Sequence, residues 1–191
     1  YSAEDGMPND WHLVHLGSRA LGGAGLVMTE MTDVTEDGRI TLGCAGIYRD
    51  AHAKAWKRIV DFVHERTPAK IGMQLAHAGR KGSCELPWVA PGDPPLRDAR
   101  AWETLGPSAI PFDTKVGSPP PRAMTRADMV SVRDAFVAGT AVRGSRYSRT
   151  ATGPVRMDIT EPGGTWSLGV GYPATPGRFS TRGQAGAETI H

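Results

Sequence analysis

The sequence predicts an α/β fold, a partial (β/α)8 TIM barrel that has only the N-terminal units and a disordered C-terminal tail. Helix-like and strand-like segments alternate along about the first 80 residues, which is typical of a parallel sheet with helical crossovers. The second strand-like segment runs into the polar stretch 74–81 (QLAHAGRK), and barrel enzymes carry their chemistry at this end of their strands. Because 191 residues fall short of the roughly 250 of a complete barrel, we expect an incomplete one.

The first two predicted elements are a capped helix and a short strand. Asn9 and Asp10 are favourable caps for a helix that continues to about Leu21 and ends at the glycine pair 22–23. Residues 25–31 (GLVMTEM) form an apolar run with a polar exit, which predicts a buried strand.

A predicted loop over residues 33–46 leads to the next helix and strand. Asp50 stands where it could cap the helix, and Pro68 ends it. Its buried face is predicted from an apolar stripe at helical spacing, formed by Trp56, Ile59, Val60 and Val63. Residues 69–75 then predict the second strand.

Residues 84–122 contain nine prolines and little periodicity. Such a long connection is uncommon in a compact domain, so it is either a functional loop or an insertion. Thr125 and Asp128 resemble a capping box, and Met129, Val132, Phe136 and Val137 follow at helical spacing.

The pattern changes at about Gly139. Later residues are rich in Gly, Ser, Thr, Pro and Arg, with few branched aliphatics and no period that we could use. Such a stretch buries too little apolar surface to offset its ordering entropy. We therefore predict a partial barrel domain over residues 1–138 and a tail of low order over 139–191. One hypothesis is that this tail is translated out of frame.

The charge distribution and the cysteines exclude several classes of function. The net charge is +2, and the segment from residue 141 onward contains six arginines and three acidic residues. The basic excess therefore belongs to the tail and does not indicate nucleic-acid binding. Cys44 and Cys84 lack metal-ligand spacing, which favours free thiols in a cytoplasmic protein. No apolar run approaches the roughly 18 residues of a membrane span.

Several motifs together resemble one family. They are residues 1–6 (YSAEDG), 15–27, 30–41 and 71–81 (IGMQLAHAGRK). They resemble the old yellow enzyme family of NADH:flavin oxidoreductases over residues 1 to about 138. The sequences of residues 8–15 (PNDWHLVH) and 55–64 (AWKRIVDFVH) are most similar to the reductase-like domain of anthraniloyl- and salicylyl-CoA hydroxylases. The resemblance implies an N-terminal fragment of such a barrel, and Tyr1 as first residue fits this expectation.

The resemblance implies roles for three residues. Gln74 matches the glutamine that binds the pyrimidine edge of FMN, and an amide with both donor and acceptor suits that edge. Met31 matches a residue whose backbone contacts the flavin, although core packing is nearly as good an explanation. Tyr1 matches a tyrosine that hydrogen-bonds the substrate carbonyl, which implies a catalytic and substrate-binding role. The implied cofactors are FMN and NAD(P)H as reductant.

Other candidates have ordinary explanations. His12 and His15 stand at i, i+3, but lack a third metal ligand, so no metal site is predicted. His77 is interpreted as support for the site. Arg80 and Lys81 either bind an anionic group, such as a CoA or flavin phosphate, or are solvated.

The predicted function is that of an FMN-dependent oxidoreductase, impaired as a fragment. It would pass hydride from NAD(P)H through FMN to an electron-poor alkene or an aromatic CoA thioester. The alternatives are a non-catalytic barrel fragment that docks to a partner and, less favoured, a barrel enzyme for phosphorylated sugars. The expected partners are a small-molecule substrate and either a second copy or a fused monooxygenase domain.

Overall fold

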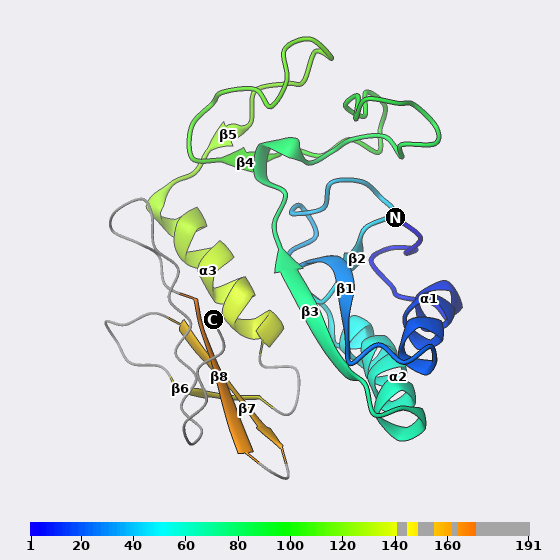
Figure 1. Ribbon diagram of the computed structural model, residues 1–191. Helices are drawn as coiled ribbons and strands as arrows, with labels where there is room; N and C mark the ends of the chain where they lie inside the picture. Colours follow the sequence, from blue (N-terminus) through cyan, green and yellow to red (C-terminus); the bar gives the residue numbers. More distant parts are fainter. Residues whose placement is uncertain (141–144, 149–154, 162–163, 171–191) are drawn as a thin grey trace, which may run out of the picture. The chain divides into compact units, whose positions relative to one another are not determined.

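The computed structural model describes residues 1–140, 145–148, 155–161 and 164–170 (Figure 1). The chain divides into two units, Tyr1–Gly139 and Thr140–His191. The predicted boundary after residue 138 lies one position from this division.

The first unit has the predicted alternation of helices and parallel strands. In chain order its main elements are α1 (Asp10–Leu21), β1 (Leu26–Asp33), β2 (Ala45–Gly46), α2 (Asp50–Arg66), β3 (Lys70–Ala76), the 3-10 turn η1 (Gly79–Lys81), β4 (Leu105–Gly106), β5 (Arg122–Ala123) and α3 (Arg126–Thr140). The helices and long strands confirm the sequence-based expectation to within two residues at most ends. The three two-residue strands, β2, β4 and β5, were not expected.

The central sheet has the strand order β2-β1-β3, and all pairs are parallel. β1 and β3 pair from Leu26 opposite Lys70 to Asp33 opposite Ala76, with an irregularity between Met28 and Met31. β2 interrupts the segment that was predicted as loop, and β4 and β5 pair across the proline-rich segment. A two-residue strand carries no periodicity, so the sequence could not reveal these pairs.

Helix starts follow local hydrogen bonding. The Asn9 side chain accepts the Trp11 amide at 3.0 Å, as expected for a cap. The predicted cap of α2 was wrong, because Arg49 occupies that position and Asp50 is the first helical residue. There the Asp50 carboxylate complements the positive end of the helix dipole.

The capping box before α3 is confirmed. The Asp128 amide donates to Thr125 Oγ1 at 3.2 Å, and the Thr125 amide donates to an Asp128 carboxylate oxygen at 2.7 Å. The two residues thereby satisfy each other's backbone donors where the helix begins.

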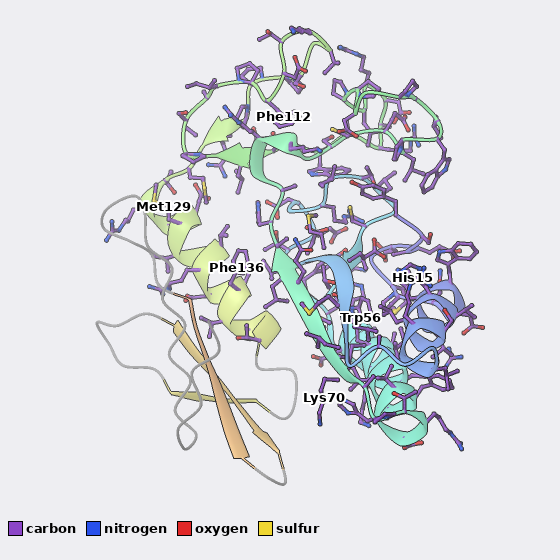
Figure 2. All side chains as sticks on the ribbon, in the orientation of Figure 1. His15, Trp56, Lys70, Phe112, Met129 and Phe136 are labelled. Atoms are coloured by element: carbon purple, nitrogen blue, oxygen red, sulfur yellow. The ribbon has the colours of Figure 1, made fainter. Side chains whose placement is uncertain are left out.

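The core lies between one face of the sheet and the helices α1 and α2, which Figure 1 shows on the same side of β1 and β3. Trp56, labelled in Figure 2, is 1% exposed and donates its indole N–H to the Gly46 carbonyl at 3.0 Å. Ile59 and Val63 are equally buried, whereas Val60 is only partly buried, so three of the four residues of the predicted stripe are confirmed as core. α3 adds Phe136 to this core.

The second unit contains an antiparallel sheet of β6 (Ser145–Ser148), β7 (Val155–Glu161) and β8 (Gly164–Val170), in that order. The prediction of a tail without regular structure is wrong for these three strands. The missed pattern is a period of two: Val155, Met157 and Ile159 alternate with polar residues, which is typical of strands. Other residues of the predicted tail, and the idea of its translation out of frame, lie outside the described residues.

In the described part of the chain, no helix is long and apolar enough to cross a membrane.

Candidate functional site

Gln74 and Met31, both predicted to bind cofactor, are direct partners across the β1–β3 pair. Partners across a pair of strands place their side chains close together. Gln74 is exposed and Met31 is partly buried. The two residues therefore lie side by side near the C-terminal ends of their strands, where barrel enzymes hold ligands.

The Gln74 side chain belongs to the face of the sheet that the helices leave open. Ile71, Met73 and Leu75 pack into the core against the helices. Since side chains alternate along a strand, Gly72 and Gln74 point to the other face. A side chain at Gly72 would collide with Met28 of β1, so glycine at this position makes room for the Met28 side chain on the open face.

A bulge in β1 fixes the backbone around Met31. The Thr29 hydroxyl donates to the Glu30 carbonyl at 2.8 Å and accepts the Gln74 amide at 3.2 Å. The Thr32 hydroxyl donates to the same carbonyl at 3.0 Å. Bulges bend a strand and re-aim its side chains, and sequence reasoning missed this one because threonine is ordinary in strands.

Tyr1, the predicted catalytic residue, lies near Glu30 of β1 but is not a partner of Gln74 or Met31. Its amino group is 3.0 Å from Glu30 Oε2, and its ring centroid is 6.5 Å from that of Trp88. Burial is the main cause that raises the pKa of the Tyr1 phenol. The hydroxyl therefore stays protonated and remains a hydrogen-bond donor at neutral pH.

Glu30 is the site residue that the sequence analysis left without a role. Its Oε1 lies 2.8 Å from Nε2 of the buried His12. Burial opposes its ionisation, but hydrogen bonds from His12 and the terminal amino group lower its pKa below the usual value. These groups line a pocket of about 180 Å³ together with Ser2, Trp11, His15, Leu16 and Trp56.

His12 takes part in the start of α1. Among the described residues, no cluster of three or more His, Cys, Asp and Glu side chains has a geometry that could hold a metal ion. His12 instead completes the helix start, because its Nδ1 lies 3.1 Å from the Asn9 amide and accepts its hydrogen bond.

The polar run after β3 holds the long loop in place. His77 Nδ1 accepts the Gly79 amide at 3.0 Å, and burial lowers the pKa of its imidazole. Lys81 Nζ lies 3.0 Å from Asp93 and 5.5 Å from the ring centroid of Phe112. Arg80 donates to the Ile110 carbonyl at 3.4 Å. Both basic side chains thus contact the loop itself, which weakens the interpretation that they are simply solvated.

Asp33, at the end of β1, is a buried carboxyl that the sequence analysis did not single out. It is 0% exposed and lies close to Cys44, a buried free thiol. Burial raises the pKa of Asp33 to about 8, against the opposing charge of Arg39. A large part of this carboxyl is therefore protonated at neutral pH.

Comparisons with known proteins give a consistent picture. The sequence profile of the NADH:flavin oxidoreductase / NADH oxidase family matches residues 1–144. An NADH:flavin oxidoreductase of Gibberella zeae is 41% identical over 140 residues, which cover 72% of this chain and 33% of that protein. An NADPH dehydrogenase of Listeria monocytogenes is 46% identical over 121 residues, which cover 62% of this chain and 31% of that protein.

Solved structures agree on the fold. Old Yellow Enzyme from Pichia sp. AKU4542 matches with a TM-score of 0.59 and 25% identity, over 74% of this chain and 35% of that one. Morphinone reductase matches with a TM-score of 0.56 and 24% identity, over 73% of this chain and 37% of that one. The chain thus spans about a third of the length of the curated relatives that it matches.

Proposed function

This chain belongs to the NADH:flavin oxidoreductase / NADH oxidase family, and on that premise we propose that its first unit forms the opening part of an FMN-dependent oxidoreductase barrel. NAD(P)H is the proposed reductant. When bound, the flavin supplies the hydride-transfer chemistry, while the protein supplies binding, orientation and electrostatics.

The observation that carries the proposal is the placement of Gln74 beside Met31 on the open face of the sheet. An exposed carboxamide offers a donor and an acceptor to the imide edge of a flavin. The bulge beside Met31 re-aims the backbone of β1 at this point, next to the Gln74 carboxamide. The residues present therefore fit FMN, with Gln74 and the Met31 backbone as its proposed contacts.

Tyr1 is the proposed hydrogen-bond donor to the substrate. Its raised phenol pKa keeps the proton on the hydroxyl, and a protonated phenol polarises a carbonyl oxygen. The proposed substrate is an electron-poor alkene or an aromatic CoA thioester. The second choice rests on the resemblance to anthraniloyl- and salicylyl-CoA hydroxylases, which also makes a fused monooxygenase domain a candidate partner. A cytoplasmic location stays a prediction.

We further propose that the 191-residue chain alone binds FMN weakly and has no turnover. Barrel enzymes often hold a phosphate with the loops after their seventh and eighth strands. The first unit has two long strands, β1 and β3, and three two-residue strands. These are fewer than the eight strands that such a phosphate site requires. A non-catalytic role is therefore the second candidate for this chain.

A chimera tests the proposed flavin site. Residues 1–140 replace the matching segment of the Listeria NADPH dehydrogenase, and the purified protein is examined for bound FMN and for NADPH oxidation. We expect the chimera to retain FMN and to oxidise NADPH, whereas the 191-residue chain shows neither in a flavin fluorescence titration. A folded chimera without flavin would count against the proposed site, and micromolar FMN binding by the chain alone would refute the proposed weakness.

A further inference from the structure

Residues 84–95 form a loop whose base is closed by hydrogen bonds. The Glu85 amide donates to the Pro94 carbonyl at 2.9 Å, and the Leu96 amide donates to the Ser83 carbonyl at 2.7 Å. These bonds hold the two ends of the loop together, although no helix or strand lies within it. Compact surface loops of this kind are frequently functional, so the side chain at the tip is a candidate for binding.

The tip of this loop carries Trp88. The Val89 and Ala90 amides both donate to the Leu86 carbonyl, at 2.9 and 3.1 Å, and turn the chain there. The Trp88 side chain stands in this turn and is 66% exposed. Tryptophan is highly buried on average, and its large planar ring is enriched at binding interfaces. An indole exposed to this extent on a tethered loop therefore indicates a contact surface.

The tip of the loop lies against Tyr1. The ring centroids of Trp88 and Tyr1 are 6.5 Å apart, and their planes are inclined by 59°. Gly43 permits this approach, because a side chain at that position would collide with the Tyr1 carbonyl and with the Leu86 side chain. The Gly43 carbonyl also accepts the Ala3 amide at 3.0 Å. Backbone contacts thus hold the indole beside the phenol, although neither ring is buried.

Two charged groups next to the loop influence the Tyr1 hydroxyl. Lys81 Nζ and the Asp93 carboxylate are 3.0 Å apart. Burial is the main cause that raises the pKa of the Tyr1 phenol, and Cys44 comes next. Lys81 then lowers this pKa and Asp93 raises it. The hydroxyl is therefore close enough to the loop to respond to its charges, so the hydrogen-bond donor and the indole are neighbours of the same loop.

We propose that Trp88 determines substrate specificity: its indole stacks on an aromatic ring of the substrate, while the Tyr1 hydroxyl donates to the carbonyl oxygen of the same molecule. This inference rests on the proposed function, in which a substrate reaches that hydroxyl. The space beside the Tyr1 ring therefore stays accessible to a small molecule. Among the proposed substrates, Trp88 selects those that carry an aromatic ring close to the carbonyl group.

The spacing of the two protein rings suits such a substrate. Aromatic rings attract each other at centroid separations of about 4.5–7 Å, in offset or tilted arrangements. Because Tyr1 and Trp88 are 6.5 Å apart, a substrate with its carbonyl at the Tyr1 hydroxyl brings a ring attached near that carbonyl into this range of the indole. A small alkene without a ring forms the hydrogen bond alone and loses the stacking contribution.

The proposal is tested by binding of three amides to the full 191-residue chain without FMN. Cinnamamide is the aromatic probe, crotonamide has a methyl group in place of its phenyl ring, and 3-cyclohexylacrylamide has similar bulk without an aromatic face. NMR follows the five indole N–H signals, and the Trp88 signal is identified by its loss in Trp88→Leu. We expect cinnamamide to shift this signal and to bind at least about threefold more tightly than either other amide.

Substitutions at the loop tip separate stacking from general apolar contact. Trp88→Leu keeps an apolar side chain without an aromatic face, and we expect it to remove the preference for cinnamamide. Trp88→Phe restores an aromatic ring and should recover most of the preference. Val89→Leu is the matched control, because this neighbour in the same turn is 63% exposed and should leave the preference unchanged. Circular dichroism checks the fold of each variant.

The proposal is wrong if cinnamamide and crotonamide bind equally, if the cyclohexyl amide binds as tightly as cinnamamide, or if Trp88→Leu keeps the parental preference. Failure of the proposed function looks different, because no flavin takes part in this measurement. A chimera that retains FMN while Trp88 shows no preference removes only the role of Trp88. A flavin-free chimera together with the expected preference removes the flavin site and leaves the aromatic contact.

Discussion

The two faces of the β1–β3 sheet show opposite physical chemistry. The helical face packs Leu16, Trp56 and Ile59 into a buried apolar core, whereas the open face exposes Leu26, Met28 and Gln74. Burial of apolar area stabilises a fold, so the helical face holds the first unit together. The open face contributes little to stability and is therefore free to bind a ligand or a partner.

The largest effect is expected on the helical face. Trp56→Ala removes a side chain that is 1% exposed and its hydrogen bond to the Gly46 carbonyl, and we expect a loss of about 3–5 kcal/mol in the free energy of unfolding. Urea unfolding followed by circular dichroism measures it. The control is Trp11→Ala, a tryptophan 68% exposed, for which the expected loss is below about 1 kcal/mol. Similar losses for both variants would mean that the helical face is not the core.

The buried carboxyl of Asp33 at the end of β1 gives the next effect, which is a dependence of the free energy of unfolding on pH. Its raised pKa, about 8, lies above the unfolded value of about 4. Between these values the folded state keeps a proton that the unfolded state releases, so the free energy of unfolding falls as the pH rises.

Asp33→Asn removes this dependence. We expect the stability of the variant relative to the parent to rise by roughly 4–5 kcal/mol between pH 4 and pH 8, because about four pH units separate the folded and unfolded pKa values of Asp33. Urea unfolding at several pH values between 4 and 8 measures the difference. Asp61→Asn, at a surface carboxyl, serves as control. An unchanged pH slope in Asp33→Asn would assign the dependence to other groups.

A moderate effect is expected on the open face, in binding and not in stability. Gln74→Ala in the chimera with the Listeria enzyme should raise the FMN dissociation constant about tenfold, because hydrogen bonds to the flavin edge are lost. The urea midpoint should stay unchanged, since the side chain is exposed. Gln74→Glu keeps the shape but lacks the donor, and we expect it to bind FMN as weakly. Parental affinity in both variants would remove Gln74 from the site.

The smallest effect is expected where the two strands meet. Thr29→Val deletes the hydroxyl that accepts the Gln74 amide, and we expect a loss of about 1 kcal/mol in the free energy of unfolding. Thr29→Ser keeps the hydroxyl and should retain most of the stability. No loss of stability in Thr29→Val would mean that the hydrogen bond from the Gln74 amide does not stabilise the fold.

Local sequence patterns were enough to predict the helices and the long strands of the first unit. The stripe from Trp56 to Val63 and the cap at Asn9 predicted helices that the structure confirms. The failures share one cause, since the two-residue strands and the bulge at Thr29 arise from pairing with distant segments. The alternation in residues 155–161 was present but was outweighed by the Gly- and Pro-rich composition around it.

The amino-acid sequence alone determined the family and the alternating helices and strands, because periodicity and motifs depend on neighbouring residues. The folded chain decided that Met31 and Gln74 meet, that Glu30 joins His12 beside Tyr1, and that Asp33 is sealed from water. These are contacts between residues far apart in the chain, and only packing brings such residues together.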